Sequence, residues 1–129
     1  MHRSRLTSIL IDCAPGDYEN GIEFWSRALG KDARIDDDRY ATFEGSIGGE
    51  GGLLIGLQRV PREERATHLD IETDDVEAEV SRLEGLGARV KARIGKHVVM
   101  TSPTDHAFCV VPVFRDDFPA NATEWEKGE

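Results

Sequence analysis

Hydrophobic and polar positions change from a strand-like to a helix-like pattern within residues 67–88. The first seven of these residues alternate, which predicts a strand with one buried face. Its polar side is formed by His68, Asp70 and Glu72. The apolar positions that follow have helical spacing, and acidic residues that suit a helix start stand before them. They are Val76, Val80, Leu83 and Leu86. We expect Leu69 and Ile71, on the apolar side of the strand, to pack against this helix, so that the polar side lines a cleft.

The same succession of patterns occurs in the first half of the chain. Alternation over residues 6–13 predicts a strand, and apolar positions within residues 17–29 predict a helix that ends at Gly30. The matching helix of the second half is predicted at residues 75–86. Three segments of strand character follow each helix, at 33–35, 39–44 and 53–60, and at 88–94, 97–101 and 107–113. Each half therefore reads strand, helix and three strands, which favours a duplicated α+β domain.

A length of 129 residues is typical of a single domain. We divide it into module one at 6–60, a linker at 61–66, module two at 67–113 and a C-terminal tail at 114–129. A loop at residues 45–52 holds five glycines. It lacks the Gly-Lys-Ser/Thr ending of a phosphate-binding loop, so we interpret it as a flexible rim over a site.

The composition excludes several classes of protein. A hydrophobic fraction of 39% with 32% charged residues indicates a globular chain rather than a disordered one. The formal net charge of −9 argues against nucleic acid and against acidic membranes as partners. No segment is apolar enough for a signal peptide or a membrane span. Two cysteines, Cys13 and Cys109, suit reduced thiols, so we expect a cytoplasmic protein.

Three stretches of the chain resemble the vicinal oxygen chelate superfamily, which includes glyoxalase I, extradiol dioxygenases and bleomycin-resistance proteins. The segment Phe24-Trp25-Ser26-Arg27-Ala28-Leu29-Gly30 is similar to the aromatic first helix of that superfamily. His68-Leu69-Asp70-Ile71-Glu72 is similar to the start of its second module, and Ser102-Pro103-Thr104-Asp105-His106-Ala107-Phe108-Cys109 to its closing turn and strand. Small bacterial glyoxalase-like domain proteins are the most similar members. The resemblance implies two βαβββ modules whose curved mixed sheets surround a shared cleft.

The resemblance also implies where metal ligands would lie. Metal-dependent members place one ligand on the first and one on the last strand of each module, and here these positions hold Ser8, Gln58, His68 and Ala107. A divalent metal in an open site is typically held by three protein ligands. Here only His68 is a good ligand, so the expected cofactor is none, with a divalent metal as the less favoured alternative.

We expect the cleft to bind a small-molecule ligand. Its predicted lining is Ser8, Asp12, Gln58, His68, Asp70 and Cys109. The leading interpretation is a metal-free protein that sequesters or carries this ligand, as antibiotic-resistance relatives do. One alternative is a lyase or isomerase in which His68 with Asp70, or an unusual metal site, performs the chemistry. A second is an interaction module whose cleft its own side chains fill. No nucleophile is recognisable beside His68, so the sequence assigns no catalytic residue.

The tail after residue 113 carries two large aromatic side chains, Phe118 and Trp125. Rings of this size on a tail pack onto the body of the chain or onto a partner subunit. Because small relatives of this type usually pair, we expect a homodimer.

Overall fold

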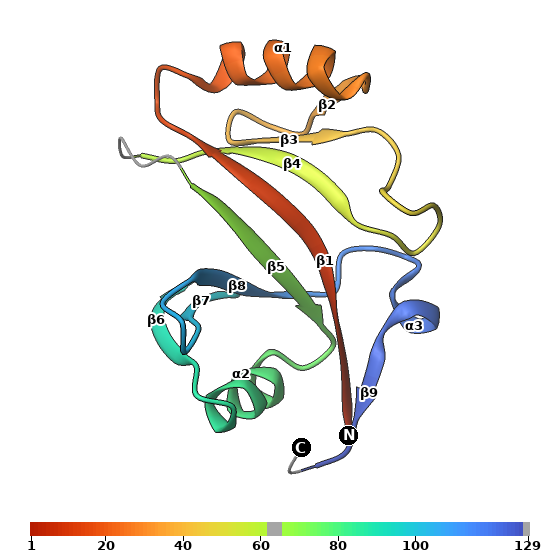
Figure 1. Ribbon diagram of the computed structural model, residues 1–129. Helices are drawn as coiled ribbons and strands as arrows, with labels where there is room; N and C mark the ends of the chain where they lie inside the picture. The colour runs from red at the N-terminus through yellow and green to blue at the C-terminus, as the bar shows by residue number, and fades with distance from the viewer. Residues whose placement is uncertain (62–65, 128–129) are drawn as a thin grey trace. The chain divides into compact units, whose positions relative to one another are not determined.

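The computed structural model describes residues 1–61 and 66–127 (Figure 1). The elements follow in the order β1 (His2–Cys13), α1 (Tyr18–Leu29), β2 (Ala33–Ile35), β3 (Tyr40–Phe43), β4 (Leu54–Arg59), β5 (Thr67–Thr73), α2 (Val76–Gly85), β6 (Arg89–Ile94), β7 (His97–Thr101), β8 (Ala107–Pro112), α3 (Phe118–Asn121) and β9 (Thr123–Trp125). The order strand, helix and three strands occurs twice, which confirms the predicted α+β class. Most of the predicted linker lies outside the described residues. Contacts divide the chain into two compact units, Ser8–His68, and Met1–Thr7 with Leu69–Glu129.

The unit Ser8–His68 is a mixed sheet with one helix. Its strands lie in the order β2-β3-β4-β1, with β1 parallel to β4 and the other pairs antiparallel. The apolar stripe of α1 packs into the core of this sheet, as predicted. This core contains Cys13, Tyr18, Ala41, Phe43 and Leu57, with Ile22 and Trp25 packed against it. The unit therefore buries its apolar side chains between the sheet and α1.

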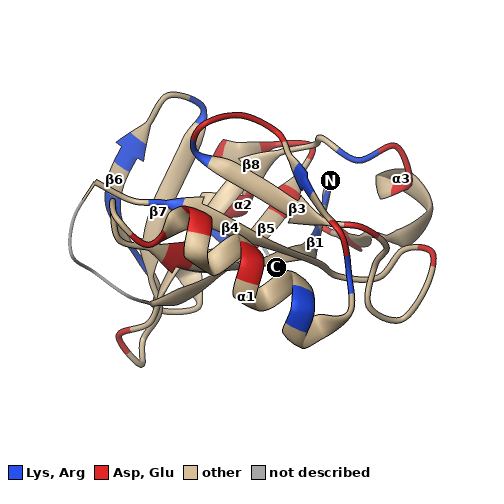
Figure 2. Ribbon diagram, turned by 90° about the horizontal axis from the view of Figure 1, so that it is seen from above, with Lys and Arg blue, Asp and Glu red and all other residues tan. Residues whose placement is uncertain are grey.

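Two glycines and the end charges of α1 explain how this helix fits. A Cβ atom at Gly21 would lie 2.9 Å from Leu57 Cδ2 and 3.0 Å from Cys13 Sγ, so any other residue would require these side chains or the helix to shift. Gly30 ends the helix in the left-handed conformation, with φ of 66°. Glu19 in the first turn and Arg27 in the last complement the helix dipole. Figure 2 shows this separation of acidic and basic segments along α1.

The second unit repeats this arrangement around α2. Its strands lie in the order β5-β8-β7-β6, with β5 parallel to β8 and the others antiparallel. Asp75 caps α2 by accepting a hydrogen bond from the Ala78 N–H at 3.0 Å, as its place before the helix predicts. The core consists of Val80, Ala88, Val98, Met100 and Val110.

The C-terminal tail folds back onto its own unit. β9 pairs antiparallel with the start of β1, where His2 lies opposite Trp125. The Trp125 indole N–H donates to Ser4 Oγ at 2.9 Å, and Phe118 is only 2% exposed. The rings that motivated the homodimer therefore pack within the chain. They no longer support the homodimer, which stays a prediction.

Three local predictions were wrong. β1 begins at His2 rather than at residue 6, because its polar side chains find buried partners: His2 Nε2 lies 2.7 Å from Glu79 Oε1. Leu69, expected beneath the helix, is 43% exposed and outside the core. Glu72, expected to line a cleft, is fully buried, and its carboxylate is hydrogen-bonded by backbone groups of the tail. Glu72 Oε2 accepts the backbone N–H groups of Phe114 and Arg115 at 2.7 and 2.8 Å.

None of the described helices is long and apolar enough to cross a bilayer.

Candidate functional site

A row of polar side chains crosses three neighbouring strands of the unit Ser8–His68. Asp12 of β1 lies opposite Gln58 of β4, and Gln58 lies opposite Tyr40 of β3. Residues paired in this way project from the same face of a sheet. The Gln58 side-chain amide donates a hydrogen bond to the Tyr40 hydroxyl at 3.3 Å. The intervening residues on β1 and β4, Ile11 and Leu57, pack on the opposite side with α1. The row is therefore on the face that α1 does not cover.

His68 joins this row through Asp12. The imidazole Nδ1 lies 3.0 Å from Asp12 Oδ2, and the two side chains are 12% and 14% exposed. A backbone hydrogen bond from the Asp12 N–H to the Ala66 carbonyl, at 2.8 Å, holds the two segments in place. Because an ionised carboxylate can only accept, Nδ1 is the nitrogen that donates in this contact. This arrangement orients an imidazole for hydrogen bonding or for proton transfer.

The second oxygen of Asp12 has an unusual environment. Oδ1 is buried and has no hydrogen-bond partner within residues 1–61 and 66–127. A buried acceptor without a donor costs roughly 1–3 kcal/mol. A ligand hydroxyl, amine or amide that donated to Oδ1 would remove this cost. Asp12 thus has one oxygen that orients His68 and one whose capacity to accept a hydrogen bond is unused within the described residues.

The remaining predicted cleft residues have different positions. Ser8 is buried on β1, four residues before Asp12 and opposite Leu54. Asp70 and Cys109 belong to the other unit, where they face each other across the β5–β8 ladder. Alternation places Asp70 on the same side of β5 as His68. The pairing of His68 with Asp70 stays a prediction, and the contact seen at the imidazole Nδ1 is with Asp12.

The four positions that the superfamily uses for metal do not fit a divalent ion here. Ser8 offers a buried neutral hydroxyl, Gln58 a neutral amide and Ala107 a methyl group. His68 is the one good ligand type of the four, and its Nδ1 contact with Asp12 leaves that unchanged, since a metal-ligating imidazole typically bonds a carboxylate through its other nitrogen. Other residue types that bind metals, Asp70 and Cys109, lie along β5 and β8. The implied ligand set therefore lacks the charged groups that offset the dehydration of a metal ion.

The buried thiol of this unit is not a nucleophile. Burial raises the pKa of Cys13, and the negative charges of Asp17 and Asp12 raise it further. The thiol stays protonated at neutral pH, whereas nucleophilic attack needs the thiolate. Cys13 therefore belongs to the core beneath α1.

Sequence reasoning missed Tyr40 as a member of the polar row and Asp12 as the partner of His68. A signal for Tyr40 was present, since it lies in a predicted strand at a polar position of the alternating pattern. No comparable signal exists for the Asp12–His68 pair, because 56 residues separate its members.

Comparison with known proteins places this geometry in context. The sequence profile of the glyoxalase-like domain family matches residues 8–111. No curated protein sequence matches the chain.

Several solved structures share the fold. Streptomyces coelicolor methylmalonyl-CoA epimerase in complex with 2-nitronate-propionyl-CoA has a TM-score of 0.57 at 18% identity, over 86% of this chain and 98% of that one. The Mn(II)-bound glyoxalase from Novosphingobium aromaticivorans has a TM-score of 0.55 at 20% identity, over 84% of this chain and 40% of that one. A structure described as NAD-dependent benzaldehyde dehydrogenase from Legionella pneumophila has a TM-score of 0.62 at 13% identity, over 83% and 98%. At such identities the likeness concerns the fold alone.

Proposed function

The chain belongs to the glyoxalase-like domain family of the vicinal oxygen chelate superfamily, and from this premise we propose that it binds a small molecule at the Asp12–His68 pair. The buried Asp12 Oδ1, with no partner in the described chain, is the observation that carries the proposal. A ligand that donates a hydrogen bond there would complete the coordination of a carboxylate already fixed by His68. Gln58 and Tyr40 supply further polar contacts along the same row.

The class of ligand follows from the chemistry of this row. Asp12 accepts hydrogen bonds, so the ligand carries a hydroxyl, amine or amide donor. Fold neighbours support small organic ligands, since one is a structure of an epimerase with a propionyl-CoA derivative. We also propose that the protein sequesters or carries this ligand without a metal. The same proposal includes a cytoplasmic location and the pairing of two chains.

The first prediction tests Asp12 as the ligand acceptor. We expect some members of a library of small hydroxy and amino metabolites to raise the thermal midpoint of the wild-type protein, because a ligand bound only to the folded state stabilises it. Asp12→Asn removes the carboxylate with almost no change of shape, so those increases should disappear. The matched control is Asp38→Asn, at an exposed position of the β2–β3 turn, which should keep them.

Two results would refute the binding proposal. One is a library in which no compound raises the midpoint of the wild-type protein. The other is a set of active compounds that stabilise Asp12→Asn as strongly as wild type.

A second candidate function is a lyase or isomerase of the glyoxalase type. The observation that favours it is the imidazole of His68 held by the Asp12 carboxylate, a pair of groups that general acid–base catalysis uses. Such pairs typically contribute rate factors of about 10²–10⁴ to proton abstraction.

The second prediction separates this candidate from the first. We expect the purified protein to retain less than stoichiometric zinc, nickel or iron, and not to isomerise the hemithioacetal of methylglyoxal and a thiol. The reason is the incomplete ligand set at Ser8, Gln58 and Ala107. Elemental analysis after dialysis, together with the isomerase assay, provides the measurement. One metal ion per chain that is lost in His68→Ala would contradict the metal-free prediction, and isomerase activity would favour the enzyme.

A further inference from the structure

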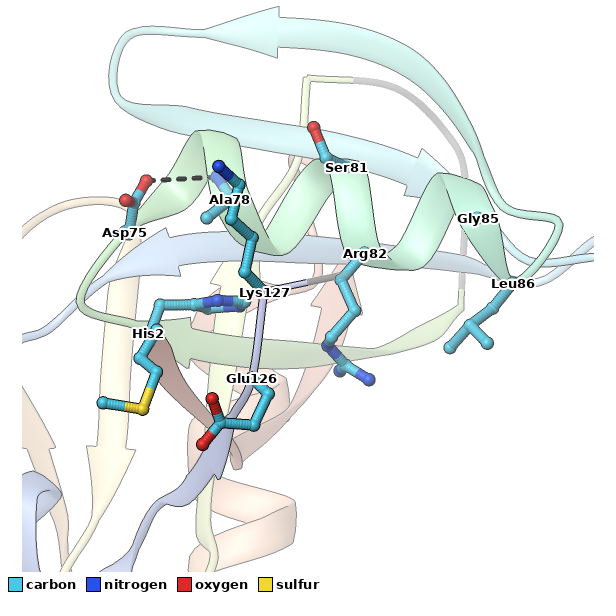
Figure 3. A pocket seen from close by; sticks show the side chains of 10 residues that line it. His2, Asp75, Ala78, Ser81, Arg82, Gly85, Leu86, Glu126 and Lys127 are labelled. Atoms are coloured by element: carbon cyan, nitrogen blue, oxygen red, sulfur yellow. Dashed lines mark hydrogen bonds between the residues drawn. The ribbon is translucent and has the colours of Figure 1, made fainter. Parts of the chain in front are cut away.

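A cavity of about 580 Å³ lies beside α2, in the unit that does not contain the Asp12–His68 pair (Figure 3). Its volume is in the range of cavities that hold small organic ligands. The lining comes from the start of β1, one side of α2 and the end of the tail. It consists of Met1, His2, Asp75, Ala78, Ser81, Arg82, Gly85, Leu86, Glu126 and Lys127. We call this space the α2 cavity.

Arg82 is the fixed polar group of the α2 cavity. Its Nε and Nη2 donate to the two carboxylate oxygens of Glu79, both at 2.8 Å. Its guanidinium also lies over the Trp125 ring, with 3.8 Å between Cζ and the ring centroid. Glu79 is fully buried, and its Oε1, which accepts from Arg82 Nε, also lies 2.7 Å from His2 Nε2. The side chain of Arg82 is thus held by contacts on one edge and one face.

The other edge of this guanidinium is available to a ligand. Nη1 has no hydrogen-bond partner in the part of the chain that the structure describes, since both bonds of Arg82 use Nε and Nη2. The Nη1/Nη2 edge presents two parallel N–H donors, which match the two oxygens of a carboxylate. Figure 3 shows the guanidinium directed away from α2 toward the side where His2 and Glu126 lie.

The remaining lining is apolar at the walls and of mixed charge at the rim. Met1, Ala78 and Leu86 supply the hydrocarbon surface, and Leu86 is 64% exposed. Glu126 and Lys127, both exposed, contribute one charge of each sign. The carboxylate of Asp75 already accepts the Ala78 N–H. Arg82 is already paired with Glu79, and the two carboxylates of Asp75 and Glu126 outnumber the ammonium of Lys127, so a monoanion meets less repulsion here than a dianion.

We propose that the α2 cavity binds an apolar monocarboxylate, whose carboxylate bonds the Nη1/Nη2 edge of Arg82 and whose hydrocarbon chain lies against Leu86 and Met1. The tail is part of this site for two reasons. Trp125 packs against the Arg82 guanidinium, and the rim is formed by Glu126 and Lys127. This second site is independent of the Asp12–His68 pair.

The two tryptophans provide an internal reference for the experiment. Trp125 contacts Arg82, whereas Trp25 lies in α1 of the other unit. Octanoate is titrated into the ¹⁵N-labelled protein while the two indole N–H signals and the Arg82 Nε–H signal are followed. We expect saturable shifts of Trp125 and Arg82 with Trp25 unchanged. 1-Octanol, which has the same chain without the charge, should bind about tenfold more weakly, as expected for losing one charge-assisted hydrogen bond.

A matched pair of variants tests the location. Leu86→Glu places a carboxylate on the wall of the cavity, and Ile94→Glu makes the same change at a residue that is 61% exposed and outside it. Both positions are exposed, so neither substitution threatens the core. Leu86→Glu should weaken octanoate binding about tenfold or more, and Ile94→Glu should leave it unchanged. Equal effects of the two variants, equal affinity for octanol, or shifts that also involve Trp25 would overturn the proposal.

Discussion

Buried charges near the start of β1 are stabilised by specific partners rather than by solvent. Burial alone would raise the pKa of Glu79, but hydrogen bonds from Arg82, His2 and Ser4 outweigh it and lower the pKa below the ordinary 4.5. A carboxyl whose pKa is lowered on folding stabilises the folded state above the pKa of the unfolded chain. That stabilisation is lost as pH falls from about 4.5 through the folded value. Glu79 therefore contributes to acid sensitivity.

The third prediction follows from the lowered pKa of Glu79. Between pH 6 and pH 4, the free energy of unfolding of the wild-type protein should fall more steeply than that of Glu79→Gln, because the amide cannot take up a proton. At pH 6 the variant should be less stable by about 3 kcal/mol, since Arg82 loses its buried partner. Urea unfolding at each pH gives both quantities. Parallel pH profiles for the two proteins would show that another carboxyl dominates.

At the scale of elements, the tail is a structural part of its unit. Phe118, at the first position of α3, is buried, and the Arg5 guanidinium lies 5.6 Å from its ring centroid. Arg5 in turn donates from Nε to Glu72 at 2.8 Å and from Nη2 to Asp117. This set of contacts links β1, β5 and the tail. The tail therefore contributes to the stability of the unit.

The fourth prediction compares two phenylalanines of the tail. Phe118→Ala should lower the free energy of unfolding by about 3–5 kcal/mol, because it removes a buried ring. Phe114→Ala, at a side chain that is 56% exposed, should change it by less than about 0.5 kcal/mol. Chemical denaturation of both variants provides the measurement. Equal, small effects would mean that the tail detaches without loss of stability.

At the scale of the whole molecule, association has to overcome the net charge of −9 on each chain. Exposed apolar side chains such as Phe24, 61% exposed on α1, offer surface for pairing. Salt shortens the range of repulsion between chains, from about 10 Å at 0.1 M to about 3 Å at 1 M.

The fifth prediction is the homodimer, whose stability depends on apolar contact between the chains and on the repulsion between their net charges. Light scattering at micromolar concentration should show two chains per particle, and the dimer fraction should rise with ionic strength as the repulsion is screened. A monomer at both low and high salt would contradict it.

The sequence by itself determined the order of elements and the character of each face. Alternation and helical spacing are local properties, so the two βαβββ modules, the Asp75 cap and the turn at Gly30 could be read from neighbours in the chain. The motifs around Trp25, His68 and Cys109 identified the superfamily for the same reason. Strand alternation also placed Asp12, Gln58 and His68 on the faces opposite the helices.

Only the tertiary structure decided which of these polar residues meet. Asp12 Oδ2 lies 3.0 Å from His68 Nδ1, and residues that are 56 positions apart in the chain carry no local signal of such a short distance. Glu72 has the same strand parity as His68, yet it is buried, because the returning tail supplies two N–H donors to its carboxylate. The position of the tail depends on long-range packing of Phe118 and Trp125, and periodicity contains no information about that packing.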